Sequence, residues 1–502
     1  MTVGRDRQFD LAVAASAVLV YLGAVWNGFA LDDGPMIRFN PLVQNPSGMW
    51  RAFAQPWWAG AFGGQYYRPL PVATLALDAW VDGAAWFHTV NLLWHAGASV
   101  AVAVLARRWS GALAGLIAGL LFAVHPVHVE AVANVVGRGE LMAALCTLLA
   151  VYGAVVRESV AWSTAALVLA LLSKENAAVA PALIALAWVL GLSRPPKRRL
   201  LAFASALGAV AIGYFAVRWA VLHRYTGFAD IAPVFVGAAA LPVRLTAVAA
   251  LADVARLLVF PLRLRVDYSL QERTLIATAS DPRFLAGVLC VAVWAALLVL
   301  AWRRRRRVEV YGLAWIALAF LPVANLLFPV GILIGERTLY LPSAGLALAA
   351  GTWLAGLQTR LRGLLVGLVV VAGAARTALR VPVWHDDTAV TLSILEDSPR
   401  SYRGPQYAAA LLQASRNPAR ALEYYRTALA IYDRDSRLFI GAADAAFALR
   451  RPALADSLLE RARQLCGRCD VNYANQANAA RARGDGAVAD SLLRRATPLG
   501  KQ

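Results

Sequence analysis

Long apolar runs, separated by short polar stretches, recur from the N-terminus to about residue 380. A membrane-spanning helix needs about 20 mainly apolar residues. Eleven runs approach or reach this length: 9–28, 87–107, 111–124, 140–156, 160–173, 176–192, 199–222, 284–302, 309–328, 340–357 and 363–381. Charged residues make up only 16% of the chain, against about 25% in soluble globular domains. The pattern predicts an all-α, polytopic membrane protein with about 11 transmembrane helices.

The basic residues, which give the chain a net charge of +19, indicate membrane orientation. They lie in short clusters between the runs, as in Arg107-Arg108 and residues 303–307, so we expect no nucleic-acid partner. Residues 241–262 place Arg244, Asp253 and Arg256 along one side of a helix, which is typical of an amphipathic helix at the membrane surface. If this helix does not cross the bilayer, every cluster lies on the cytoplasmic side.

This topology puts the N-terminus in the cytoplasm and two long loops, 29–86 and 223–282, on the outer side. The first run is longer than the apolar core of a signal peptide, which spans roughly 7–15 residues, so we expect an uncleaved span. Residues 1–384 then form a transmembrane domain. Residues 385–502 form an extracytoplasmic domain.

Sequence repeats mark this second domain. Alanines recur at a period of about 34 residues in three series, which are Ala409, Ala443 and Ala477; Ala421, Ala455 and Ala489; and Ala428, Ala462 and Ala496. Small residues at this period lie where paired helices touch in tetratricopeptide repeats. We therefore expect a short α-solenoid, with Asn417-Pro418, Arg451-Pro452 and residues 484–486 in its turns and a concave surface for a partner.

Cys466 and Cys469 lie near the end of the second repeat. A local disulfide between them fits an oxidising compartment. Haem attachment is excluded because Asp470, and no histidine, follows the second cysteine.

One polar stretch between apolar runs, residues 125–140, contains His125, His128, Glu130, Arg138 and Glu140. Ionisable side chains at the edge of a membrane are costly unless they are paired or in contact with water, so this stretch is a candidate functional site. Imidazole and carboxylate groups also suit a divalent metal ion. The spacing matches no zinc signature, however, and we favour hydrogen bonding to a polar substrate.

Asp32 and Asp33 follow the first apolar run directly. Of two adjacent carboxyl groups, one can keep a raised pKa and act as a general base. The alternative for this pair is a helix cap or a salt bridge at the membrane edge.

Three cations, Arg138, Lys174 and Arg337, fall on the predicted outer face, with Arg68 and Arg218 as weaker candidates. Each could form a simple salt bridge with a neighbouring acid, as Arg337 could with Glu336. Together they exceed what the outer face should carry without an anionic ligand. A lipid phosphate at membrane depth is the anion that we expect.

Several polar stretches follow one another along the chain: Asp32-Asp33, Tyr67-Arg68-Pro69-Leu70, Phe87-His88 with Asn91 and His95, residues 125–141, Ser173-Lys174-Glu175, Asp267-Tyr268-Ser269 and residues 336–343. In sequence and in order they resemble the transmembrane and tetratricopeptide-repeat-containing O-mannosyltransferases, which are polytopic glycosyltransferases of the GT-C class. The stretches run across nearly the whole predicted membrane domain and are followed by the repeats. The repeat array is shorter than in animal members, and the composition looks bacterial, so we expect a bacterial inner-membrane protein.

The resemblance implies transfer of a sugar, expected to be mannose, from a polyprenyl-phosphate donor to a hydroxyl group of a protein or glycan. It implies inversion at the sugar, with Asp32 or Asp33 as the base. Arg138, Lys174 and Arg337 would bind the donor phosphate. His125, His128, Glu130, Glu140, Glu336 and Arg68 would orient the substrates.

Two questions stay open at this point. Some GT-C enzymes use a divalent metal ion and others do not, so the metal dependence is undecided. The alternative function is that of a non-catalytic, membrane-anchored scaffold, in which the outer charges are structural and the repeats bind partners.

Overall fold

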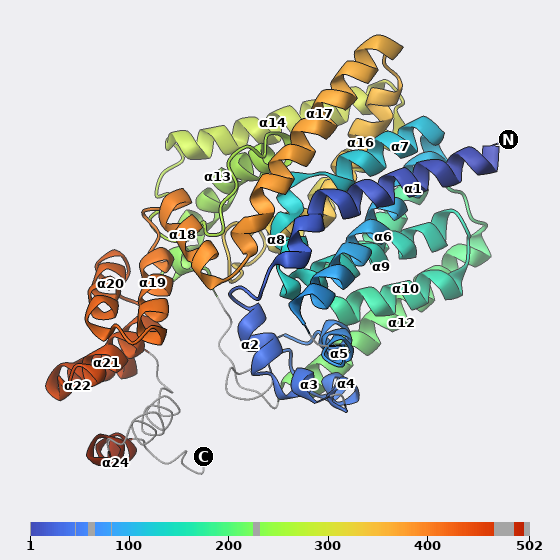
Figure 1. Cartoon of the computed structure of the whole chain (residues 1–502). Helices are drawn as coiled ribbons and strands as arrows, with labels where there is room; N and C mark the ends of the chain where they lie inside the picture. The colour runs from blue at the N-terminus through green and yellow to red at the C-terminus, as the bar shows by residue number, and fades with distance from the viewer. Residues whose placement is uncertain are drawn as a thin grey trace. The chain divides into compact units, whose positions relative to one another are not determined.

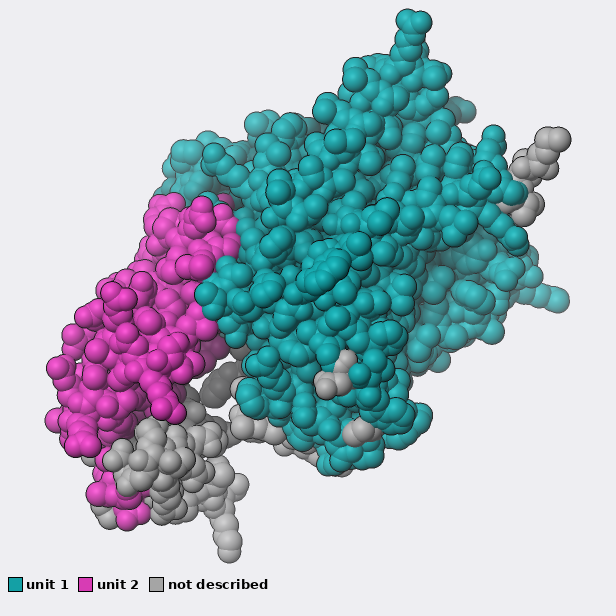
Figure 2. All heavy atoms as spheres, in the orientation of Figure 1, with its two compact units in different colours: residues 1–266, 275–390 teal, residues 267–274, 391–502 magenta. Residues whose placement is uncertain are grey.

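The computed structural model describes residues 2–45, 47–58, 66–81, 83–223, 231–465 and 486–495, and every regular element in these ranges is a helix (Figure 1). This confirms the all-α expectation for the described residues. The chain divides into two compact units (Figure 2). Unit 1 comprises residues 1–266 and 275–390, and unit 2 comprises residues 267–274 and 391–502.

Among the described residues of unit 1, six helical segments are long and apolar enough to cross a membrane: Gly4–Trp26 with α1, Ala84–Ser110 (α6), Val135–Val155 with α9, Lys197–Leu222 (α12), Pro282–Arg303 (α14) and Thr359–Trp384 with α17. A seventh is formed if α7 (Ala112–Ala123) and Pro126–Ala133 are one span, bent by 48°. The bend lies where Pro126, which lacks a backbone N–H, interrupts the helix. The expected number of 11 spans therefore stays a prediction.

Other predicted spans are shorter helices in the structure. They are α10 (Val160–Ser173), α11 (Ala180–Val189), α15 (Arg307–Phe320) and α16 (Tyr340–Ala355). The backbones of α15 and α16 approach closely, since a Cβ atom on Gly345 would lie 2.4 Å from the carbonyl oxygen of Gly312. Small residues at such contacts are typical of packed helices in membranes.

Three of the long helices expose apolar side chains along most of their length. In α12, α14 and α17, Ile212, Leu289 and Leu368 are 73%, 63% and 62% exposed. Apolar surface of this extent is costly in water and is stable against lipid. Unit 1 is therefore the part of an integral membrane protein that contacts the bilayer.

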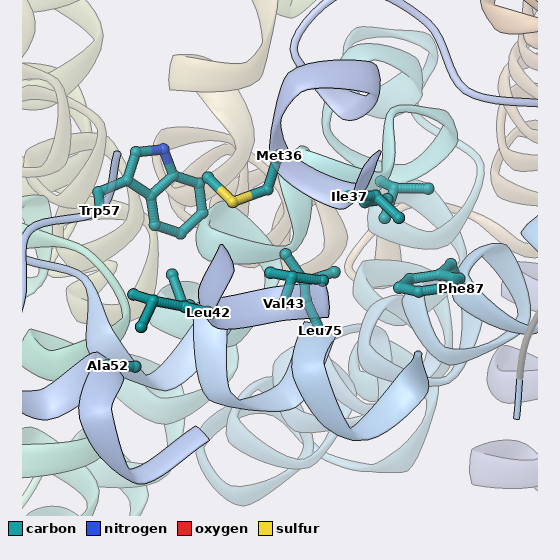
Figure 3. Packing of buried hydrophobic residues seen from close by; sticks show 10 residues of the cluster. Met36, Ile37, Leu42, Val43, Ala52, Trp57, Leu75 and Phe87 are labelled. Carbon is teal, nitrogen blue, oxygen red and sulfur yellow. The ribbon is translucent and has the colours of Figure 1, made fainter. Parts of the chain in front are cut away.

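The loop after α1 folds into short helices, α2 (Asp33–Arg38), α3 (Pro41–Gln44), α4 (Gly48–Arg51) and α5 (Pro69–Asp78). The apolar side chains of this loop form one buried cluster, which includes Met36, Leu42 and Trp57 and reaches Phe87 on α6 (Figure 3). Val135 belongs to the same cluster. This packing fixes the N-terminus of α2 against the polar stretch 125–140. The second predicted outer loop contains α13 (Ala240–Val259), which is not among the six candidate spans.

Unit 2 contains the helices α19 (Arg403–Ala414), α20 (Pro418–Ile431), α21 (Ser436–Ala448), α22 (Pro452–Leu465) and α24 (Gly486–Arg495). Pro418, Pro452 and Gly486 each begin a helix, as the expected turns require. The described alanines of the three repeat series are all buried: Ala409, Ala421, Ala428, Ala443, Ala455, Ala462 and Ala489. Ala477, Ala496, Cys466, Cys469 and residues 484–485 lie outside the described residues.

Candidate functional site

Asp33, at the start of α2, is buried and only 1% exposed. Its Oδ1 accepts a hydrogen bond from the N–H of Val136 (2.7 Å), and its Oδ2 accepts from Val135 (3.1 Å) and Ala30 (3.4 Å). Burial raises the pKa of Asp33 to about 7, although the three N–H groups act in the opposite direction. This carboxyl group holds the first loop against residues 135–136.

Asp32 differs sharply from its neighbour, because its side chain is 52% exposed. Its Oδ2 lies 3.9 Å from Nη1 of Arg337. The second carboxylate at Arg337 belongs to Glu130, whose Oε2 accepts from the backbone N–H of Arg337 (2.8 Å) and whose Oε1 lies 3.5 Å from its Nε. The side chain of Arg337 is 32% exposed. Among the described residues its guanidinium makes no hydrogen bond within normal distance and angle limits, so its N–H groups are available to a further acceptor.

Lys174 and Glu140 form a close ion pair, and Asn176 also donates to the Glu140 carboxylate (3.1 Å). Burial lowers the pKa of Lys174; Glu140 opposes this shift, while Arg68 and Arg337 add to it. Arg68 and Arg337 are thus both close enough to Lys174 to disfavour its charged form.

Arg68 and Glu175 form a bidentate pair, with Nε to Oε2 at 2.9 Å and Nη2 to Oε1 at 2.6 Å. The guanidinium of Arg68 also lies over the ring of Tyr66, 4.4 Å from its centroid, and 5.7 Å from the ring of Trp57. Glu140 and Glu175 both act to raise the pKa of Arg68, against the opposing effect of its burial.

These residues form one electrostatic group, which we call the charge cluster: Asp32, Arg68, Glu130, Glu140, Lys174, Glu175 and Arg337. It joins the first loop, the stretch 125–140, the α10–α11 connection and the segment before α16. Four carboxylates and three cations are present, and every cation faces at least one carboxylate. Asp32, Lys174 and Arg337, which come from distant parts of the chain, are thus neighbours in this cluster, whereas Arg138, predicted to act with them, is not part of it.

Other predicted site residues lie elsewhere. Arg138 is completely buried, where it pairs with Asp78 and donates to Asn91 Oδ1 (2.9 Å) and to the carbonyl of Phe87 (3.0 Å). Its guanidinium is occupied by protein acceptors, so we do not include it in the charge cluster. Asp78 also accepts from the indole of Trp86 (3.2 Å).

The two predicted histidines lie in an aromatic cluster with Phe122 and Tyr340. His128 is buried and bonded through Nε2 to Ser343 Oγ (2.7 Å), and His125 Nε2 lies 2.9 Å from the carbonyl of Leu258. These contacts give both histidines structural partners. The predicted substrate-orienting roles of His125 and His128 stay untested.

Glu336 is buried next to Arg337, but its Oε1 accepts from the backbone N–H of Arg265 (2.6 Å). Within the part of the chain that the structure describes, no group of three or more His, Cys, Asp or Glu residues is arranged to hold a metal ion.

Several residues that complete these contacts were not among the predicted site residues. Glu175, Asn91 and Phe87 stand in the stretches that carry the family resemblance, but no role was predicted for them. Asn91 and Phe87 are four residues apart on one face of α6, which is the signal that links them. Asp78 and Asn176 had none, because nothing near them in the sequence shows which cation they meet.

Comparison with known proteins gives an independent result. No protein-family model matches the chain. Protein O-mannosyl-transferase TMTC4 of Homo sapiens is 27% identical over 487 residues, covering 83% of this chain and 65% of that protein. Protein O-mannosyl-transferase F38B6.6 of Caenorhabditis elegans is 28% identical over 354 residues, covering 67% of this chain and 50% of that protein. Protein O-mannosyl-transferase Tmtc2 of Drosophila melanogaster is 39% identical over 143 residues, or 26% of this chain and 15% of that protein.

The chain thus spans only about half to two thirds of the length of the first two relatives. The similarity nevertheless extends over most of this chain, which agrees with the resemblance of its motifs. Over most of its length, the chain is therefore similar to proteins that are named protein O-mannosyl-transferases.

Proposed function

We propose that the protein is a membrane glycosyltransferase that moves a mannosyl group from a polyprenyl-phosphate donor to a hydroxyl group of a protein or glycan. The names of its relatives support the class of reaction. The observation that carries the assignment to specific residues is the pairing of an exposed carboxylate, Asp32, with Arg337, whose guanidinium still has N–H groups to offer.

Asp32 is the base in this proposal. Its carboxylate takes the proton from the acceptor hydroxyl, and that oxygen forms a bond to the anomeric carbon. The bond from the anomeric carbon to the phosphate oxygen breaks, and its electron pair stays on the departing polyprenyl phosphate. Arg337 donates hydrogen bonds to the phosphate as negative charge grows on it, and Lys174 and Arg68 add positive potential.

Asp33 has a different role in the proposal. It is sealed from solvent and its oxygens accept three backbone hydrogen bonds, so an acceptor hydroxyl has no path to it. A base must come within hydrogen-bond reach of the proton that it removes. Asp33 instead positions Asp32 by fixing the loop.

The test compares Asp32→Asn with Asp33→Asn in the purified full chain, with polyprenyl-phosphate mannose as donor. Transfer of mannose to protein acceptors is measured with proteins from the cells that produce the chain. Transfer of mannose to water is measured as hydrolysis of the donor. We expect Asp32→Asn to lower turnover by about 10²-fold or more, in the range of general-base loss, with an unchanged melting temperature. Glu158→Gln is the matched control, since Glu158 is an exposed carboxylate paired with Arg199 outside the charge cluster.

Full turnover by Asp32→Asn would exclude Asp32 as the base. If the unmodified protein neither transfers nor hydrolyses the donor and its melting temperature does not respond to it, the scaffold function is favoured instead. A bound ligand at about 100 times its Kd should stabilise the fold by about 2.7 kcal/mol.

A further inference from the structure

A short strip, Asp267–Thr274, lies in the sequence between α13 and α14 of unit 1 but belongs to unit 2. Asp267, Tyr268 and Glu272 in this strip are all buried. Leu270 packs against the buried cluster of Tyr402, Ala409 and Leu438. The strip is therefore a built-in part of the repeat unit.

Asp267 is the main polar anchor of the strip. Its Oδ2 accepts from Ser401 Oγ (2.5 Å) and Ser269 Oγ (2.5 Å), and its Oδ1 lies 3.4 Å from Nε of Arg403. Its carbonyl accepts from Ser398 Oγ (2.7 Å). A second anchor is Glu272 Oε1, which accepts from the backbone N–H of Arg400 (2.9 Å).

The residues that flank the strip are fixed inside unit 1. On the side that precedes it, the backbone N–H of Arg265 donates to Glu336 Oε1 (2.6 Å). On the side that follows it, the N–H of Ile276 donates to Thr246 Oγ1 on α13 (2.9 Å). Only Val266 separates Arg265 from Asp267, so the position of Asp267 restricts where the Arg265 N–H can be.

Glu336 is the residue immediately before Arg337. Buried and bonded to Arg265, it fixes the start of the short helix Glu336–Leu339. Glu130 then holds the N–H and the Nε side of Arg337. Glu336 thus anchors the backbone next to Arg337 and is bonded to the chain that enters the strip, while Glu130 and Asp32 face the guanidinium itself.

We propose that Glu336 is a positioning residue for Arg337, and that the grip of the repeat unit on the strip acts on Arg337 through Glu336. An acceptor that binds the repeats and tightens or loosens this grip would change how the donor phosphate is held. The inference rests on the proposed role of Arg337. Coupling of this kind requires a contiguous set of contacts that can take two arrangements. The contacts described here supply the set in one arrangement, and acceptor binding would have to favour the other.

The test measures binding of polyprenyl phosphate, the product lipid, by the purified full chain. Arg337→Ala should weaken binding roughly tenfold to hundredfold, since hydrogen bonds to charged groups are worth about 1.5–3 kcal/mol. Glu336→Ala should weaken it about fivefold, whereas Glu336→Gln should stay within about twofold, because an amide oxygen also accepts the Arg265 N–H. Ser401→Ala and Arg403→Gln in unit 2 should each weaken binding about threefold.

Two further measurements separate coupling from general loss of stability. Combined with Arg337→Ala, neither unit 2 variant should cause an additional loss, and hydrogen exchange of the peptide 336–341 should rise in both. Arg437→Gln is the control, because the Arg437 guanidinium pairs with Asp435 in unit 2 and not with an acid of the strip.

Wild-type binding and wild-type exchange in Ser401→Ala and Arg403→Gln would overturn the inference and leave the proposed function intact. So would losses that add fully to that of Arg337→Ala. If Arg337→Ala binds the lipid normally, the proposed phosphate role of Arg337 is wrong. In that case, raised hydrogen exchange of the peptide 336–341 in Ser401→Ala and Arg403→Gln would still support coupling between the repeat unit and Glu336.

Discussion

Two arginines in unit 1, Arg138 and Arg337, carry the same guanidinium group in different surroundings. At Arg138 the guanidinium is sealed, paired with Asp78 and bonded to Asn91 and the Phe87 carbonyl. At Arg337 the guanidinium is about one third exposed, and its carboxylate neighbours lie at 3.5 and 3.9 Å. A buried charge that is paired and bonded within the protein is needed by the fold, whereas a partly exposed charge with hydrogen-bonding groups to spare can bind a ligand. A position near the membrane edge therefore does not show whether an arginine is structural or available to a ligand.

The largest expected effect is on the sealed site. Arg138→Ala leaves the buried Asp78 carboxylate without its counter-ion, so the free energy of unfolding should fall by about 3–5 kcal/mol. Equilibrium unfolding in detergent measures this loss. Replacing both charges by apolar residues, with Arg138→Met and Asp78→Leu, should recover most of it. If Arg138→Ala were as stable as the wild type, Arg138 would not be a structural charge, and the contrast with Arg337 would fail.

Asp33→Asn should have the next largest effect on stability. Because one amide oxygen cannot accept all three backbone hydrogen bonds, we expect the free energy of unfolding to fall by about 1–3 kcal/mol. The substitution should also change the pH profile. The pKa of Asp33 is raised to about 7 in the folded protein, mainly by burial, against about 3.9 in an unfolded chain. Between about pH 4 and 7 the folded state therefore binds more protons, and the stability of the wild type should fall as the pH rises. Asp33→Asn should flatten this part of a melting-temperature profile, and an unaltered profile would exclude Asp33 as its source.

A smaller effect is expected at Arg68, which is intermediate between the sealed and the open site. Arg68→Lys keeps the charge but loses the bidentate contact with Glu175 and the stacking over Tyr66. We expect a loss of stability of about 1 kcal/mol, measured by thermal unfolding. A loss as large as that of Arg138→Ala would place Arg68 among the sealed, structural charges.

The smallest effect is expected where both partners are exposed. The side chains of Arg199 and Glu158, which form an ion pair, are 42% and 38% exposed. Such exposed pairs contribute about 0–1 kcal/mol, so Glu158→Gln should unfold at nearly the wild-type temperature. High salt should leave this variant unchanged, and a clear salt-dependent loss would show that exposure alone does not predict the value of a pair.

The general architecture could be predicted from the sequence because it depends on periodic patterns. Apolar runs predicted a helical membrane protein, and the regularly spaced alanines proved to be buried contact positions, as at Ala421 and Ala455. Helix lengths were harder, because a run such as 309–328 does not reveal where its helix, α15, ends.

The site was only partly predictable, for a physical reason. Asp32 and Asp33 are adjacent and identical in type, and only tertiary packing decides which of them meets the N–H groups of Val135 and Val136. In the same way, the partner of Arg138 lies on α5, far away in the sequence, and no local pattern links the two. Sequence identified the charged residues but could not tell which would be sealed.

The strip in unit 2 has a consequence for how the protein can be processed. The polypeptide passes between the units three times, at 266–267, 274–275 and 390–391. A protease that nicks the last junction would leave both fragments joined through residues 267–274, with the serine and arginine contacts of Asp267 still in place. Shedding of the repeats would require either further cleavage or dissociation of this buried strip.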